Sequence, residues 1–80
     1  MSTTAEELLS IMSLRLKMQD DGLTNPSTSV KIATRSLVEK LSGLDGKEKI
    51  EISIGDDVFA KYIRAATGEV LTEIKLDENT

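Results

Sequence analysis

Carboxylates are the side chains most able to do chemistry in this sequence, because it contains neither histidine nor cysteine. That absence removes the commonest metal ligand and general base, together with thiolate nucleophiles and disulfides. Adjacent carboxylates occur at Glu6–Glu7, Asp20–Asp21 and Asp56–Asp57. A catalytic pair needs two carboxyl groups that converge on one cleft, and sequence neighbours in turns usually point apart. We therefore expect capping and turn roles, no catalytic residue and no enzyme.

The oxygen-rich segment around Asp20, Asp21 and Asn25 lacks the D-x-[DN]-x-[DN]-G spacing of a calcium loop. The sequence also contains no glycine-rich phosphate loop and no nucleophile elbow. We therefore predict no metal site and no cofactor.

The composition describes one small acidic domain of 80 residues with a net charge of −4. That charge argues against direct nucleic-acid binding, because phosphate neutralisation needs a basic surface. The N-terminus is acidic at Glu6–Glu7 where a signal peptide would be basic, and no apolar run approaches the ~20 residues of a membrane span. We expect a cytoplasmic protein that is not bound to a membrane.

A helix over residues 5–20 is predicted by Thr4 and Glu7, which fit the S/T-x-x-E capping box. Two apolar stripes run along this helix, about a third of a turn apart. The first comprises Ala5, Leu8, Leu9, Met12 and Leu16, and the second comprises Ile11, Leu14 and Met18.

The second stripe allows two interpretations. The helix could lie between a sheet and another helix, which would bury both stripes within one chain. Alternatively, Ile11, Leu14 and Met18 could contact a second chain, since methionine suits adaptable interfaces.

A second helix is predicted over residues 26–42, with Asn25 as the N-cap and Pro26 at the first helical position. Gly43 directly follows this helix, at the position where glycine commonly ends one. One face of this helix is apolar, with Val30, Ala33, Leu37, Val38 and Leu41.

Residues 49–76 are predicted to form an antiparallel sheet of three strands, with turns at 55–57 and 66–69. Ile50, Ile52 and Ile54 alternate with polar residues and should face the helices. From the later strands the same face should receive Phe59, Lys61, Ile63, Ala65, Val70, Thr72, Ile74 and Leu76, with Lys61 as a defect in the pattern. The expected fold is therefore α+β, with two N-terminal helices packed on a small three-stranded sheet and an acidic tail at 77–80.

Residues 56–67 could instead form a third helix between two strands. Asp56 or Asp57 would cap it, and Gly68 would follow its end. By periodicity this is the cleaner pattern, with Val58, Phe59, Tyr62, Ile63 and Ala66 on one stripe. It would leave a two-stranded sheet, which is marginal in so short a chain. Both arrangements stay open.

The run from Phe59 to Ile74 resembles the hairpin of FlaG-type flagellar proteins, in which a Thr-Gly-Glu-Val turn joins two strands behind a helix. The resemblance covers about a fifth of the chain, and Lys75 follows Ile74 where the family pattern has a proline. It implies a hairpin here, and no function is carried over from it.

These features predict a non-enzymatic protein–protein interaction module that binds another protein or itself, as a homodimer. Its apolar contacts would be Ile11, Leu14 and Met18 of the first helix, and its second candidate surface is the outer face of the sheet. That outer face should present Tyr62, Arg64 and Leu71. The alternative is an acidic inhibitor or nucleic-acid mimic, encoded by a phage or mobile element, that occupies a basic surface of a partner.

Overall fold

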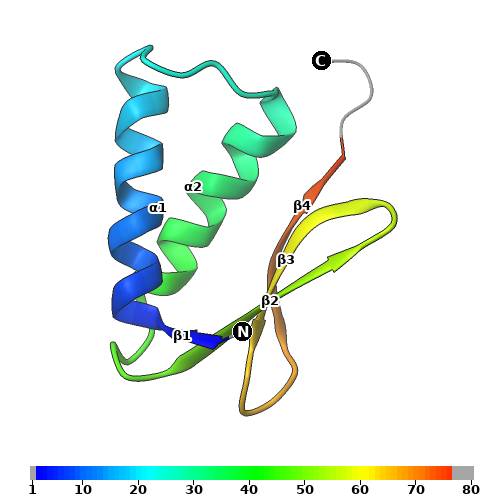
Figure 1. Ribbon diagram of the computed structural model, residues 1–80. Coiled ribbons are helices and arrows are strands. Elements are labelled where there is room, and N and C mark those ends of the chain that lie inside the picture. The colour runs from blue at the N-terminus through cyan, green and yellow to red at the C-terminus, as the bar shows by residue number, and fades with distance from the viewer. Residues whose placement is uncertain (1, 77–80) are drawn as a thin grey trace.

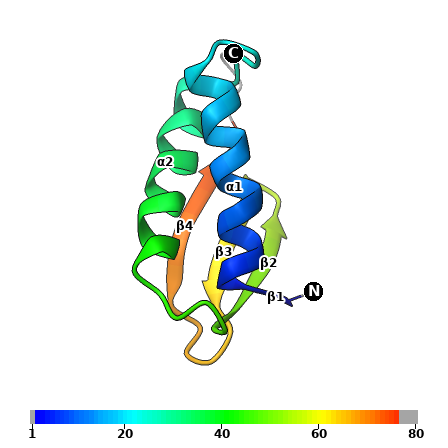
Figure 2. The same cartoon turned by 90° about the vertical axis from the view of Figure 1, so that its left-hand side faces the viewer.

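The computed structural model describes residues 2–76, which form a four-stranded antiparallel sheet with two helices on one of its faces (Figures 1 and 2). The strands follow one another in the order β1-β2-β3-β4. The elements are β1 (Ser2–Thr4), α1 (Ala5–Asp20), α2 (Thr28–Ser42), β2 (Lys49–Gly55), β3 (Val58–Arg64) and β4 (Val70–Lys75). The α+β class is confirmed, whereas the expected number of strands is wrong. The predicted tail at 77–80 lies outside the described residues.

The additional strand is β1, which pairs antiparallel with the start of β2. Its three residues are serine and threonine, so they lack the apolar alternation that reveals a strand in a sequence. Thr4 ends β1 and also caps α1, because its Oγ1 accepts a hydrogen bond from the Glu7 amide (3.2 Å). The Ala5 amide donates to the carbonyl of Glu48 (2.7 Å), which ties the first turn of α1 to the start of β2.

The helix α1 ends where predicted, in a Schellman motif. Gly22 adopts a left-handed conformation (φ 75°), and the Leu23 amide donates to the carbonyl of Met18 (2.9 Å). The residue in this position needs a positive φ, which glycine adopts without steric cost. The turn directs the chain back along α1 toward α2.

The start of α2 differs from the prediction, because Ser27 is its N-cap in place of Asn25. The Ser27 hydroxyl accepts a hydrogen bond from the Val30 amide (3.3 Å), and the helix begins at Thr28. Asn25 instead accepts a hydrogen bond from the Lys31 ammonium (3.0 Å). Both residues favour N-caps, so residue preference alone could not select between them.

Replacing Ser27 with alanine is expected to lower the free energy of unfolding by about 1 kcal/mol, because the cap hydrogen bond is lost. Asn25→Ala removes only an exposed side-chain contact, and its expected change lies within about 0.5 kcal/mol. Urea denaturation followed by circular dichroism measures both variants. Equal losses, or a greater loss in Asn25→Ala, would contradict the assignment of the cap.

Residues 58–64 form a strand, so the alternative helix over 56–67 is not present. The strand β3 pairs with β2 and β4, and Phe59 is an extra residue opposite β4, between the pairs Val58–Lys75 and Ala60–Ile74. Such a bulge changes which side chains face each side of the sheet. Ala60 and Tyr62 consequently point into the core, whereas Lys61 forms an ion pair with Glu73 (3.6 Å).

The core lies between the helices and the inner face of the sheet. Tyr62 and Leu71 belong to it, with 5% and 7% of their surface exposed, so their predicted position on the outer face is wrong. In β4 the cause is a second bulge, because Leu71 is an extra residue between the pairs made by Val70 and Thr72. The core residues are Ala5, Leu8, Met12, Ala33, Leu37, Leu41, Ile50, Ala60, Tyr62, Leu71 and Ile74.

Candidate interaction surface

One side of α1 carries the second apolar stripe predicted from the sequence. Ile11 and Leu14 are 51% and 60% exposed, and Met18 is partly buried. The stripe lies on the opposite side of the helix from Asp20, whose carboxylate forms an ion pair with Arg35 of α2 (2.8 Å). We call Ile11, Leu14 and Met18 the α1 flank; it points away from α2 and toward the β1–β2 side of the sheet.

The end of β2 adds further exposed apolar side chains on the same side of the molecule. Ile50 is fully buried, but Ile52 and Ile54 are 42% and 75% exposed, although the sequence pattern predicted all three in the core. Ile52 faces the helix side, because it is opposite Tyr62 in the sheet. Figure 1 shows the cause: toward its tip the β2–β3 hairpin diverges from both helices, so no helix packs against its end.

A groove of about 550 Å³ opens between the helices and the sheet next to the α1 flank. Met18 belongs to its wall, and Phe59, which is 55% exposed, lines it from the sheet. Figure 1 shows the helices and the hairpin diverging at this end of the molecule. The other lining residues are Met12, Arg15, Gln19, Thr24, Asn25, Pro26, Val30, Thr34 and Ile74. The groove therefore has a mixed lining, with apolar side chains from both helices and the sheet and polar ones from the helices and the loop that follows α1.

Arg64 was predicted to contact a partner, and the structure places its guanidinium between two carboxylates of its own chain. Its buried Nε contacts the carboxylate of Glu48 as an ion pair, in a geometry that does not make a hydrogen bond. Its Nη1 lies 3.1 Å from a Glu69 carboxylate oxygen. Arg64 thus links the start of β2 to the β3–β4 turn.

The outer face of the sheet carries a network of charges at β3 and β4. Glu73 lies 3.1 Å from the ammonium of Lys75 and 3.6 Å from that of Lys61. The hydrogen bond from Lys75, aided by the charges of both lysines, holds the pKa of Glu73 below its ordinary value. Around Glu73 this side of the sheet is charged and internally paired.

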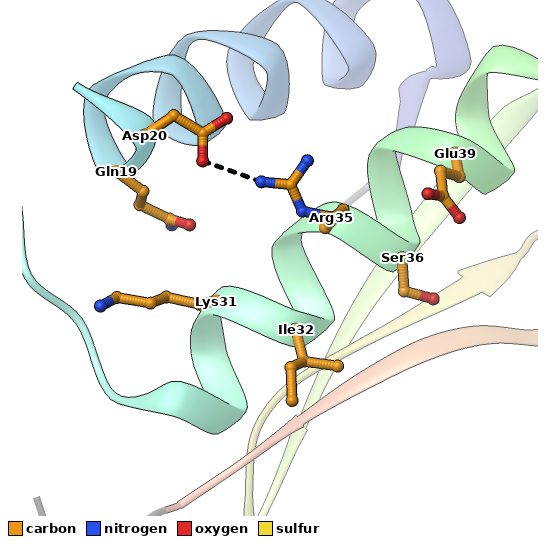
Figure 3. A pocket seen from close by; sticks show the side chains of 7 residues that line it. All are labelled: Gln19, Asp20, Lys31, Ile32, Arg35, Ser36 and Glu39. Atoms are coloured by element: carbon orange, nitrogen blue, oxygen red, sulfur yellow. Dashed lines mark hydrogen bonds and ion pairs between the residues drawn. The ribbon is translucent and has the colours of Figure 1, made fainter. Parts of the chain in front are cut away.

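A second groove, of about 560 Å³, lies between the C-terminal part of α1 and the outer side of α2. Figure 3 shows Arg35 pointing across it to Asp20, with Lys31 and the exposed Ile32 on the same helix. Arg35 is already engaged by a carboxylate of its own chain, and the Lys31 ammonium donates to the neutral Asn25 amide oxygen, so Lys31 is the one cation of this groove without an ion pair among the described residues.

The part of the chain that the structure describes contains no set of side chains that could ligate a metal ion. Within residues 2–76, no group of three or more histidine, cysteine, aspartate and glutamate side chains lies close enough to hold a metal ion. Among the same residues, neither helix has the length and apolar character of a membrane-spanning helix.

Comparisons with known proteins identify no relative. No family model matches the chain, and neither a curated protein nor a solved structure matches it. The Thr-Gly-Glu-Val turn that resembles FlaG-type proteins does connect β3 to β4, with Gly68 in a left-handed conformation (φ 72°).

Proposed function

We propose that this protein is a non-enzymatic interaction module that binds another protein chain through the α1 flank. The observation that carries the proposal is the exposure of Ile11 and Leu14. Contiguous apolar surface on a small domain usually marks a contact with another macromolecule. Burying these side chains against a partner would recover the hydrophobic free energy that folding leaves unused.

The neighbouring surfaces support the same function. Ile52, Ile54 and Phe59 extend the apolar area from α1 onto the hairpin. Tyr62 and Leu71 do not contribute, because they are in the core. Arg64 does not contribute either, since its guanidinium contacts Glu48 and Glu69. The proposed interface therefore consists of the α1 flank and the end of the β2–β3 hairpin.

The alternative, an acidic decoy for a basic surface, has less support. A decoy needs a dense array of free carboxylates that stand in for phosphates. Here Asp20, Asp21 and Glu73 form ion pairs with basic residues of the same chain, as do Glu48 and Glu69. Such pairing lowers the charge available to a partner.

Leu14→Asp tests the proposed function, because it places a charge at the centre of the α1 flank. Leu14 is 60% exposed, so the free energy of unfolding should change by no more than about 0.5 kcal/mol. Chains that bind the wild type, whether a different protein or an untagged second copy, should no longer be retained by the variant. The measurement is affinity capture from the native host's extract, followed by mass spectrometry.

Ser13→Asp is the matched control, since it adds the same charge to the same helix on an exposed residue outside the flank. It should retain every chain that the wild type binds. If no bound chain is lost from Leu14→Asp, the proposed function is wrong. If Leu14→Asp unfolds the protein, Leu14 is a core residue and the proposal also fails.

A further inference from the structure

The edge of the sheet beside the α1 flank is only partly covered. β1 pairs with Lys49–Glu51, and no described residue pairs with Ile52–Gly55 on that side. The Ala65 amide donates to the Lys49 carbonyl (3.0 Å), so the backbone groups of Lys49, Glu51 and Ser53 point toward β3. By alternation, the amides and carbonyls of Ile52 and Ile54 point outward at the free edge.

We propose that the occupant of this surface is a second copy of the chain, joined antiparallel at the Ile52–Gly55 edge. The proposal rests on the proposed function and names its partner. A two-fold axis near Ser53 and Ile54 would join the two sheets into one continuous sheet. The same axis places the two α1 helices on one side of that sheet with their flanks facing each other. One symmetry operation therefore covers both the open strand edge and the α1 flank.

The charge distribution suits this symmetry. A two-fold axis brings each side chain near its own copy, so like charges close to the axis would repel. Charged residues make up 30% of the chain, but none occurs in Ile52–Gly55. On α1, the segment from Leu8 to Leu14 is also uncharged. The paired segment and the middle of the α1 flank are thus uncharged. The nearest charges are Glu51 and Asp56 beside the segment and Glu7 and Arg15 on α1, which would lie at the margin of the interface.

The opposite edge of the sheet, formed by β4, carries charged side chains and an irregular backbone. β4 carries the Glu73–Lys75 ion pair and the bulge at Leu71, and both features are ways in which proteins protect an edge from further pairing. The side of α2 that points away from α1 presents the polar Ser36 and Lys40 together with the exposed Ile32 (Figure 3). Exposed apolar side chains are more numerous on α1 and the β2–β3 hairpin than on α2 and β4, where Ile32 and Val70 are exposed. Of the nine large apolar side chains that are exposed within residues 2–76, five belong to α1 or the β2–β3 hairpin.

Sedimentation equilibrium of the purified full chain tests the proposal. The wild type should change from 8.7 kDa to twice that mass as its concentration rises from the low micromolar range to several hundred micromolar. Leu14→Asp and Ile54→Lys should remain monomeric over this range. Ile32→Asp, at an exposed position on α2, and Val70→Lys, on the outer sheet face, should dimerise as the wild type does.

Amide hydrogen exchange tests the strand pairing itself. The Ile52 and Ile54 amides should be protected at high concentration and exchange at least tenfold faster on dilution, whereas the Ser53 amide, bonded to β3, should change little. Ile54→Pro removes one edge-facing amide and should prevent dimerisation while preserving the monomer's circular dichroism.

A chain that remains monomeric throughout would overturn the proposal. So would a dimer that Val70→Lys disrupts and Ile54→Lys does not. If the monomeric wild type still captures another protein through Leu14, only the second copy is wrong and the proposed function stands. If no chain depends on Leu14, both fail.

Discussion

Leu37→Ala is expected to lower the free energy of unfolding by about 2–5 kcal/mol. Leu37 has no exposed surface and lies in the middle of α2, within the core cluster. The substitution removes buried methyl groups and leaves a cavity that neighbouring elements fill only in part. For a domain of this size, whose total stability is of the order of 4–12 kcal/mol, this is a large fraction of the margin.

Ile32→Ala on the same helix is the matched control. Ile32 is 66% exposed, and its truncation should change the free energy of unfolding by no more than about 0.5 kcal/mol. Urea denaturation with a shared m-value compares the two variants. Similar losses at both positions would mean that α2 is rotated relative to the sheet.

Tyr62→Ala should destabilise the protein by about 3–5 kcal/mol, and Phe59→Ala by much less. These are the two aromatic residues of the chain, with 5% and 55% of their surfaces exposed. For a domain of 60–100 residues, a loss of this size corresponds to a fall in melting temperature of about 12 °C or more. Differential scanning calorimetry distinguishes the variants, and a greater loss in Phe59→Ala would contradict the bulge in β3.

Tyr62→Phe keeps the ring and separates packing from ionisation. Burial raises the pKa of the Tyr62 hydroxyl above its usual value near 10. The folded state therefore holds this proton more tightly than the unfolded state does. The resulting stabilisation is complete below about pH 10 and is lost as the pH rises through the raised pKa. Tyr62→Phe should abolish the part of the fall in unfolding free energy at alkaline pH that ionisation of Tyr62 causes. If the variant's stability depends on pH as the wild type's does, Tyr62 is not the source of that fall.

The helices could be predicted from sequence to within two residues, because caps and apolar spacing are local. Thr4 and Gly22 mark the ends of α1 through contacts with residues one turn away. The strand β1 could not be found in this way. Its partner, Lys49–Glu51, is distant in sequence, and its serine and threonine residues carry no apolar pattern.

The faces of the sheet were harder to predict, since a period of two fails at a bulge. The expected pattern placed Phe59, Lys61 and Ile63 toward the helices, with Lys61 as its defect. The bulge at Phe59 resolves that defect, because Lys61 reaches Glu73 on the outer face and Tyr62 enters the core. No residue type in β3 predicts the bulge at Phe59 from the sequence.

The α1 flank could be anticipated from helical spacing, whereas the hairpin part of the surface could not. Ile52 and Ile54 have the alternation of a buried strand. Their exposure depends on the direction in which the hairpin leaves the helices, since its tip diverges from both of them (Figure 1). Only the tertiary arrangement shows that the end of β2 is not packed against a helix.

The short β1 strand has a practical consequence for how this protein is handled. Ser2 lies opposite Glu51, immediately before the open part of β2, so a purification tag placed ahead of it would emerge beside Ile52. β4, the last strand of the described chain, lies at the opposite edge of the sheet and is separated from β2 by β3. N-terminal fusions could therefore obscure association that C-terminal fusions leave intact, and binding assays should use the latter.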